Sequence, residues 1–228
     1  HAMKTELKQA GLPSVDVIYN GVPMRGRRPP LNNPPTVAYA GRLVPEKGIH
    51  VLIRAFAIAT LKLPHARLLI AGQGKSEHEL RSLATQLGIA DHISWLGHLS
   101  RSELERQFEP AWVQVVPSLW SEPFGNVTTE AMMRGTAVIV SAVWAQPEII
   151  QPDVTGFLAP PGDVEAMAAS LTRLLRNQNL AESMGTLGRR RALTHFSEHA
   201  RTENFISLYQ QVQADYSTQF VTYPEVSA

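Results

Sequence analysis

The sequence predicts an α/β fold, a doubly wound parallel sheet with further helices at the C-terminal end. Two observations predict it. Short apolar runs alternate along the chain with longer segments of helical periodicity. The runs are mostly apolar and do not alternate regularly with polar residues, as expected of strands that a parallel sheet buries on both faces.

The composition fits one folded domain with short extensions. Hydrophobic residues make up 44% of the 228 residues and charged residues 18%, so the chain can bury a full core. A net charge of +1 creates no field that would attract nucleic acid. The chain has no cysteine, which excludes disulfides and thiolate metal sites and fits a cytoplasmic location. No apolar run approaches the roughly 20 residues that span a bilayer.

Residues 1–35 are expected to hold a tag remnant and a linker. His1-Ala2-Met3 is typical of an expression tag and not of a targeting segment. Residues 15–19 form a short β-like run. The next stretch is kept extended by prolines, so the compact domain is expected to begin near residue 36. These prolines are Pro29, Pro30, Pro34 and Pro35.

Strands and helices alternate from residue 36 onward. Strands are predicted at residues 36–40, 66–71, 92–96, 112–116 and 137–140. Helices are predicted at residues 47–61, 76–87 and 127–133, with a short one between residue 100 and Pro110. The first of these helices carries apolar residues at helical spacing: Val51, Leu52, Ala55, Phe56 and Ala59.

Capping residues mark the expected helix ends. Ser76 with Glu79, and Ser100 with Glu103, form the pattern of a capping box. Gly135 is expected to close the helix over residues 127–133.

After Asp163, an expected N-cap, the chain is predicted to be helical to about Tyr216, with breaks near Asn177 and Thr194. In open α/β sheets, ligands bind beyond the carboxyl ends of the strands. The candidate loops therefore begin near Gly41, Gly72, Gly97, Pro117 and Ser141.

Arg42 and Lys47 lie in the loop that follows the first strand of the domain and opens its first helix. Gly41 allows a ligand to approach the backbone closely, and two cations at a helix N-terminus can hold a diphosphate. The alternative is that both cations lie on a solvated loop face. The spacing alone leaves both interpretations open.

The turn from Gly72 to Ser76 ends like a P-loop. However, Leu69 stands where that motif needs a glycine, which excludes a nucleotide triphosphatase of that type. The third glycine of a dinucleotide-binding fingerprint is also lacking. A tight strand-to-helix turn that binds nothing remains equally consistent with the pattern.

Glu122 and Glu130 are the most informative acidic residues. Glu122 lies in a loop stiffened by Pro123 and opened by Gly125, ahead of a helix, and Glu130 lies about one turn inside that helix. Carboxylates accept hydrogen bonds from neighbouring hydroxyls, so a sugar or ribose at each is one interpretation. An acid/base pair is a second. A helix-dipole partner at Glu122 and an exposed charge at Glu130 form the third.

No metal site is expected. The histidine pair with helical spacing near the C-terminal end, His195 and His199, is far in sequence from the glycine-rich loops, and no further ligands are apparent near it.

The stretch Glu122-Pro-Phe-Gly-x4-Glu130-Ala-Met resembles the Glu-x7-Glu signature of the family-4 retaining glycosyltransferases. The likeness covers residues 17–209. It includes the segment Ile18-Tyr19-Asn20-Gly21-Val22, Gly41-Arg42 with Glu46-Lys47-Gly48, and Leu96-Gly97-His98-Leu99. The resemblance implies one Rossmann-like half of a two-domain GT-B enzyme.

The resemblance also implies roles for individual residues. Arg42 and Lys47 match the pair that holds the donor diphosphate, Glu130 matches the residue that binds the ribose hydroxyls, and Glu122 matches the carboxylate beside the donor sugar. Backbone amides would contact the sugar or phosphates at Phe124, Gly125, Asn126 and Val127. The base would be bound through backbone atoms near Gly72 and Leu99. The family needs no metal or other cofactor, because cations and helix amides neutralise the leaving diphosphate.

The domain boundaries follow from the same likeness. Residues 36–195 would be the nucleotide-sugar-binding domain, and residues 196–228 a crossover helix and tail, with an apolar stripe that includes Phe205, Leu208 and Tyr209. The N-terminal acceptor domain of such enzymes would be the missing partner, and any peripheral membrane contact would belong to the full-length protein. One departure is Trp144-Ala145, where relatives often carry Gly-Gly.

The expected function is the binding of a nucleotide diphosphate sugar, with a UDP-sugar favoured, for polysaccharide or glycolipid synthesis, and with little transfer by this half alone. Two alternatives remain: a nucleotide-sugar epimerase or phosphorylase half of GT-B type, and a non-catalytic sugar-nucleotide-binding domain.

Overall fold

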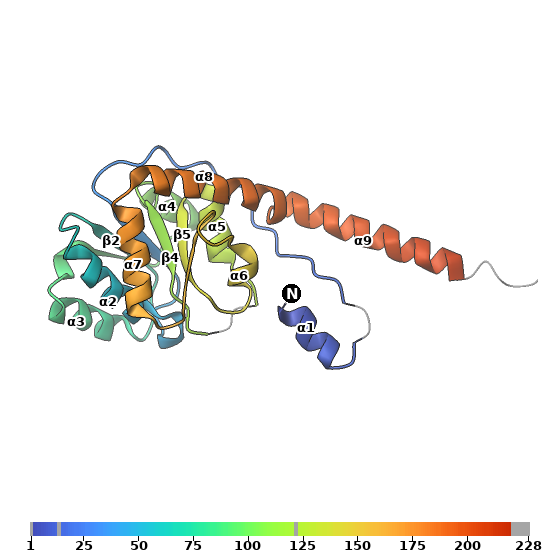
Figure 1. The fold of residues 1–228 in the computed structure, drawn as a ribbon, viewed down its shortest axis with the longest axis horizontal. Coiled ribbons are helices and arrows are strands. Elements are labelled where there is room, and N and C mark those ends of the chain that lie inside the picture. Colours follow the sequence, from blue (N-terminus) through green and yellow to red (C-terminus); the bar gives the residue numbers. More distant parts are fainter. Residues whose placement is uncertain (1, 13–14, 121–122, 220–228) are drawn as a thin grey trace, which may run out of the picture.

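A parallel sheet forms the centre of the molecule, with helices on both faces (Figure 1). The computed structural model describes residues 2–12, 15–120 and 123–219. Within them the sheet has six strands in the order β3-β2-β1-β4-β5-β6. The strands are β1 Thr36–Ala40, β2 Arg67–Ala71, β3 Ile93–Gly97, β4 Val113–Val116, β5 Ala137–Ser141 and β6 Phe157–Ala159.

The strand order reverses between β1 and β4. Successive strands from β1 to β3 are added on one side, and β4 to β6 on the other, and neighbouring strands of this sheet pair in parallel. This is the doubly wound arrangement that the sequence predicts. The crevice of such sheets lies at the reversal, so the loops that leave β1 and β4 are placed beside the ligand position.

Two layers of helices cover the sheet. The helices are α1 Ala2–Gln9, α2 Ile49–Thr60, α3 Glu77–Gln86, α4 Arg101–Gln107, α5 Asn126–Arg134, α6 Gln146–Ile149, α7 Val164–Leu175, α8 Gln178–His195 and α9 Glu198–Gln219. Helices α2, α3 and α7 share one core cluster with the sheet, α5 belongs to the cluster on the other face, and α8 contributes to both. In β5, Ile139 belongs to the first cluster and Val138 and Val140 to the second, which explains why residues 137–140 are all apolar.

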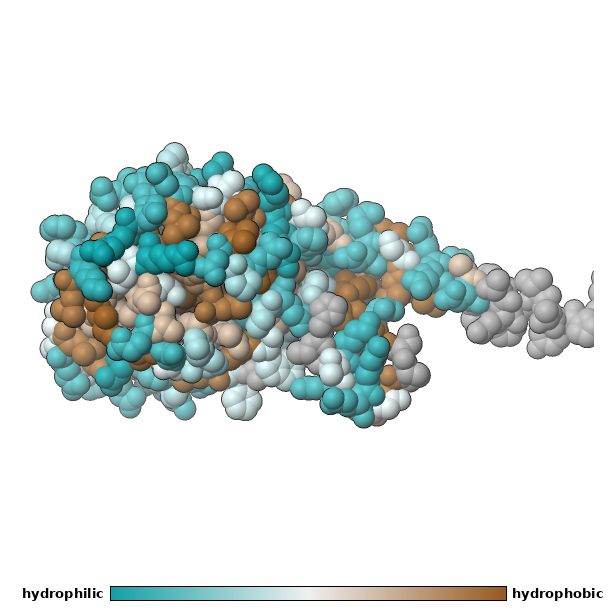
Figure 2. Space-filling model, viewed as in Figure 1, coloured by the Kyte–Doolittle hydropathy of each residue, from teal (hydrophilic) through white to brown (hydrophobic). Residues whose placement is uncertain are grey.

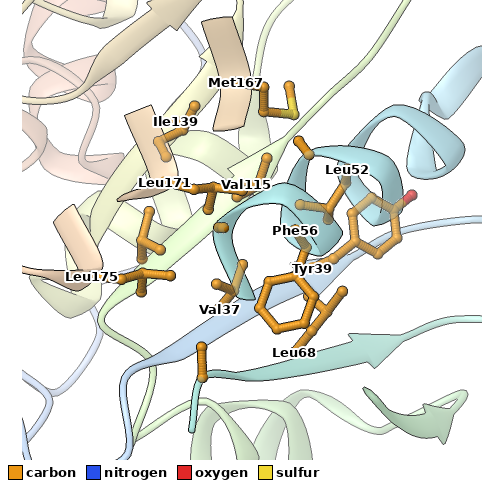
Figure 3. Packing of buried hydrophobic residues seen from close by; sticks show 14 of the residues in the cluster. Val37, Tyr39, Leu52, Phe56, Leu68, Val115, Ile139, Met167, Leu171 and Leu175 are labelled. Carbon is orange, nitrogen blue, oxygen red and sulfur yellow. The ribbon is translucent and has the colours of Figure 1, made fainter. Parts of the chain in front are cut away.

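The larger core cluster lies between α2, α7 and the sheet (Figure 3). Phe56 of α2 and Leu171 of α7 are fully buried there against Val37 and Ile139 of the strands. Burying side chains of this size contributes about 1.5–3 kcal/mol each. This core holds the strands rigidly, and the strands in turn fix where their carboxyl-end loops begin.

Most predicted elements are confirmed, with four differences. Helix α1 Ala2–Gln9 lies where only a tag remnant and linker were expected, and its sequence consists mostly of good helix formers. Residues 15–19 form no strand; Tyr19 packs its ring against Phe124 and Phe196 instead, at centroid distances of 6.0 and 5.4 Å. Helix α6 and strand β6 were not predicted, because four and three residues are too short to establish a period. The break expected near Thr194 falls two residues later, between α8 and α9.

The two predicted capping boxes have different outcomes. Ser100 accepts a hydrogen bond from the Glu103 amide at 3.4 Å, while the Glu103 carboxylate accepts one from the Ser100 amide at 2.9 Å, so this box is confirmed. The box at Ser76 is wrong. Ser76 has helical dihedrals, φ −86° and ψ −1°, and its hydroxyl caps no amide, because a capping side chain needs an extended backbone. Asp163 caps α7 as predicted.

The expected linker is extended and lies against the domain. Its Val22, Arg28 and Leu31 are buried. The Arg28 amide donates to the Arg134 carbonyl at 2.9 Å, and the Leu31 amide donates to the Glu182 carboxylate of α8 at 2.6 Å. The proline-rich stretch therefore covers part of the α5 and α8 face.

Glycines let the loops at the carboxyl ends of β1 and β2 touch through their backbones. A Cβ at Gly72 would lie 1.8 Å from the Gly41 carbonyl oxygen, and one at Gly74 would lie 2.3 Å from the Leu43 carbonyl oxygen. The Leu43 amide also donates to the Gln73 carbonyl at 2.9 Å. These contacts account for the Gly-x-Gly turn without a ligand, and they fix the loop that carries Arg42.

Gly72→Ala is expected to destabilise the fold by about 3 kcal/mol or more. The backbone of Gly72 has φ +138°, and the new methyl group would overlap a carbonyl oxygen that cannot rotate away. Gly88→Ala is the matched control, because Gly88 has φ +69° but nothing within 4 Å of the added Cβ, so about 1–2 kcal/mol is expected there. Denaturant unfolding of both variants measures the difference, and equal losses would contradict the backbone contact.

Glu182→Gln is expected to lower stability at neutral pH by about 1–3 kcal/mol, because Arg28 loses its charged partner at 3.1 Å. Burial of Glu182 raises its pKa, but hydrogen bonds from Arg28 and the Leu31 amide outweigh burial, so the pKa is lowered from 4.5. A lowered folded pKa stabilises the fold above the unfolded value, and this contribution is lost as pH falls through the folded value.

The stability difference between wild type and Glu182→Gln should therefore be constant from pH 7 to about 5 and shrink below about pH 4.5. Unfolding curves at a series of pH values measure it. A difference that stays constant down to pH 3 would contradict the assignment.

Candidate functional site

A hollow of about 330 Å³ opens where β1, β2 and β3 end. It brings together four of the residues that the sequence singles out: Gly41, Arg42, Gly72 and Leu99. They come from three different loops, so the sheet alone makes them neighbours. The position is the carboxyl edge of the sheet, on one side of the strand reversal.

Arg42 has a fixed backbone and an exposed side chain. The Tyr39 hydroxyl donates to the Arg42 carbonyl at 3.0 Å, which holds the loop. The Arg42 side chain is 71% exposed, and its guanidinium lies 3.8 Å from the Glu46 carboxylate. An exposed pair at this distance contributes little free energy, so the guanidinium can turn to a stronger anion. Lys47 ends the 3-10 helix Pro45–Lys47 in the same connection.

The start of α5 lies beyond the end of β4, on the other side of the reversal. Gly125 is its N-cap residue and has no side-chain cap, so the first-turn amides of Asn126 and Val127 belong to an uncapped helix end. A Cβ at Gly125 would lie 2.6 Å from Nε2 of Gln146, so a larger residue here would have to displace the Gln146 side chain of α6. The Phe124 ring packs in the aromatic cluster with Tyr19 and Phe196.

Glu130 lies in α5 and is held by two arginines. Its Oε1 lies 3.0 Å from Nη2 of Arg25 and 4.0 Å from the guanidinium of Arg101. Arg101 is the first residue of α4 and stands two residues after Leu99, so Glu130 lies next to the loop that leaves β3. Glu122 lies outside the described residues.

Sequence reasoning missed the arginines around Glu130. Arg134 is buried, donates to Glu105 at 3.0 Å and also donates to the Gln114 side chain. Burial lowers the pKa of Arg134, while the Glu105 carboxylate opposes this shift. Arg25 joins the same network through Nε, 3.4 Å from Glu105. The available signal was the density of arginines in residues 25–28, which sequence analysis assigned to a linker.

Trp144 lies in a left-handed backbone conformation, with φ +42°. A non-glycine residue in that region costs roughly 1–2 kcal/mol. Relatives often carry Gly-Gly at residues 144–145. The backbone at Trp144 therefore has the conformation that favours glycine, although the residue has a large side chain. Trp144 and Phe124 both line a second cavity of about 260 Å³, next to residues 15–20.

Across residues 2–12, 15–120 and 123–219, no group of three or more His, Cys, Asp or Glu side chains has the arrangement of a metal site. In the same part of the chain, no helix combines the length and hydropathy needed to cross a bilayer.

Comparison with known proteins assigns the chain to a family and agrees with its fold. The family model described as "Glycosyl transferases group 1" matches residues 25–191, most of the chain. The chain belongs to the group 1 glycosyltransferases. This glycosyltransferase chain is 34% identical over 189 residues to the D-inositol 3-phosphate glycosyltransferase of Mycobacterium ulcerans, covering 79% of the chain and 39% of that relative.

Solved structures agree with the GT-B half that the resemblance predicts. Sucrose-phosphate synthase from Thermosynechococcus elongatus has a TM-score of 0.79 and 30% identity, covering 94% of this glycosyltransferase chain and 57% of that one. HepE from Anabaena, in complex with UDP, has a TM-score of 0.71 and 23% identity, covering 77% and 48%, and shows the shared fold. The chain spans 39–47% of the length of curated relatives such as the mycobacterial inositol-phosphate enzyme and glycogen synthase.

Glu105→Gln is expected to destabilise the glycosyltransferase chain by about 1–3 kcal/mol, because two buried arginines lose their shared carboxylate. Glu109→Gln is the matched control: it lies just beyond the same helix, and the described residues give it no ion pair. Thermal unfolding of both variants measures the effect. An equally small change in unfolding temperature for the two variants would show that the Glu105 contacts contribute nothing to stability.

Proposed function

We propose that this glycosyltransferase chain is the donor-binding half of a retaining enzyme and binds a nucleotide diphosphate sugar, with a UDP-sugar favoured. The observation that carries the proposal is the placement of positive groups around the strand reversal. Arg42 and Lys47 lie in the connection after β1, and the uncapped start of α5 follows β4. Cations and helix amides are the groups that bind diphosphates.

The proposed chemistry needs no metal or other cofactor. Negative charge grows on the leaving diphosphate as the bond to the sugar breaks. Arg42, Lys47 and the first amides of α5 would stabilise that charge, because the glycine contacts hold the backbone of the loop that carries Arg42 and the helix holds its own amides. The side-chain exposure of Arg42 supports a role toward a ligand, since its contact with Glu46 is weak.

The remaining parts of the donor would be bound by residues of the other loops at this edge of the sheet. Glu130 would bind the ribose hydroxyls, and Glu122 the hydroxyls of the donor sugar. Backbone amides from Phe124 to Val127 would contact the sugar or phosphates. Gly72 and Leu99 would bind the base through their backbones, which is supported by the hollow that both line beside Arg42. The UDP complex of the structurally similar HepE supports uridine as the nucleoside.

The full-length protein would complete the site with an N-terminal acceptor domain. Helix α9 projects from the sheet domain (Figure 1), and Figure 2 shows apolar atoms along it. Phe205 and Ile206 are 43% and 44% exposed, and Tyr209 is 72% exposed. We place the acceptor domain against this helix, since exposed apolar stripes mark protein contacts. Polysaccharide or glycolipid synthesis in the cytoplasm, at most peripheral to the membrane, is the proposed setting.

Calorimetry tests donor binding. UDP or a UDP-sugar is expected to bind in the presence of EDTA, and Arg42→Ala should weaken binding about tenfold or more through the loss of a charge-assisted hydrogen bond. Arg176→Ala is the control, because this exposed arginine lines a cavity with Arg67 at the amino end of β2.

Two outcomes would count against the proposal. One is the absence of heat with UDP, ADP, GDP and their common glucose conjugates. The other is equal weakening by Arg42→Ala and Arg176→Ala. With the full-length protein and labelled donor, epimerised sugar in place of transferred sugar would favour an epimerase, and neither product would favour a non-catalytic binding domain.

A further inference from the structure

Arg25 joins two carboxylates that come from different helices. Its Nη2 donates to Oε1 of Glu130 in α5 at 3.0 Å, and its Nε lies 3.4 Å from Oε1 of Glu105 in α4. The Arg25 side chain is only 8% exposed, so these contacts form away from bulk water. Charge-assisted contacts of arginine are directional, because the guanidinium is planar and its donors have a fixed geometry.

The backbone around Arg25 is anchored independently of these carboxylates. The Arg25 carbonyl accepts a hydrogen bond from Nη1 of Arg189 in α8 at 2.9 Å, and the Arg28 amide donates to the Arg134 carbonyl at 2.9 Å. The guanidinium therefore approaches Glu130 from a fixed origin. A fixed donor selects one rotamer of the carboxylate, whereas a mobile surface lysine would not.

The two carboxylate oxygens of Glu130 differ in their contacts. Arg25 and Arg101 both lie nearest to Oε1. Over the described residues, the hydrogen bond to Glu130 goes to Oε1, and Oε2 accepts none. Oε2 can therefore accept hydrogen bonds from a pair of vicinal hydroxyls while Oε1 stays bound to arginine.

We propose that Arg25 is a positioning residue for Glu130: it orients the carboxylate so that Oε2 receives the ribose hydroxyls of the donor nucleotide. The inference rests on the proposed function, since it assigns a supporting contact to the ribose site. It also gives the proline- and arginine-rich segment a role in nucleotide binding. A purely structural arginine would hold α4 and α5 together without affecting ribose recognition.

The test compares UDP with 2′,3′-dideoxy-UDP, which lacks both ribose hydroxyls. Wild type is expected to bind UDP about tenfold more tightly than the dideoxy nucleotide, by calorimetry. Arg25→Gln should weaken UDP binding about five- to tenfold and leave dideoxy-UDP within about twofold, so the preference for UDP is lost. Arg25→Lys should retain part of the preference, because it keeps the charge without the fork geometry.

Two further variants complete the design. Arg27→Gln is the matched control from the same segment, where the arginine contacts Thr186 at 3.1 Å on the surface, and it should keep the full preference. Glu130→Gln should lose the preference, and adding Arg25→Gln to it should cause no further loss, because both act on one contact. The ratio of two ligands on one variant remains interpretable even when that variant is less stable.

The outcomes separate the two ideas. If Arg25→Gln weakens both nucleotides equally, or leaves their ratio at the wild-type value, the positioning role is overturned while donor binding stands. If wild type binds both nucleotides equally well, Glu130 recognises no ribose hydroxyl and the inference is overturned as well. If wild type binds neither nucleotide, the proposed function fails first, and the role of Arg25 fails with it.

Discussion

The site depends on the contact between two backbones, the loop after β1 and the glycine turn after β2. The Gly41 carbonyl lies where any side chain at Gly72 would be, and the Leu43 carbonyl occupies the equivalent space at Gly74. Hydrogen bonds between the two loops add direction to this contact. The loop that carries Arg42 is consequently held by main-chain atoms, and its side chain keeps its freedom for a ligand.

A network of partly buried ion pairs surrounds Glu130. Buried arginines usually need carboxylate partners, because an unpaired charge in the interior is costly. Here Glu105 serves both Arg25 and Arg134, and Glu130 shares Arg25 with it. The network ties α4, α5 and the extended segment together. Stability and site geometry thus rest on the same few charges, so a substitution in the network affects both.

The sequence predicted the fold well because the signal is local and repeated. Strands such as β5 are apolar at four consecutive positions, 137–140, and helices such as α2 carry a clear period, so the parallel sheet follows without tertiary information. Ser76 shows the limit of local reasoning: it has the capping pattern of Ser100, but its amide donates to Leu43 and its backbone is helical.

The sequence also predicted which loops lie together at the edge of the sheet, but not all of the side chains that meet there. Loops after parallel strands meet at one edge, which places Arg42 near Leu99. The partners of Glu130 could not be predicted, because Arg25 is 105 residues away from it in the sequence and no periodic pattern connects them. Prolines beside Arg25 indicated an extended chain but not the surface on which it lies. Residues whose roles depend on long-range ion pairs therefore need the folded structure.

The burial of Val22, Arg28 and Leu31 also defines where the polypeptide can be shortened. A truncation that starts at Thr36, the first residue of the sheet, would remove the strip that covers α5 and α8. It would leave Glu182 without its arginine and the Arg134 carbonyl without its amide donor. A fragment cut at the edge of the sheet would therefore lack contacts that the domain makes with residues 22–31.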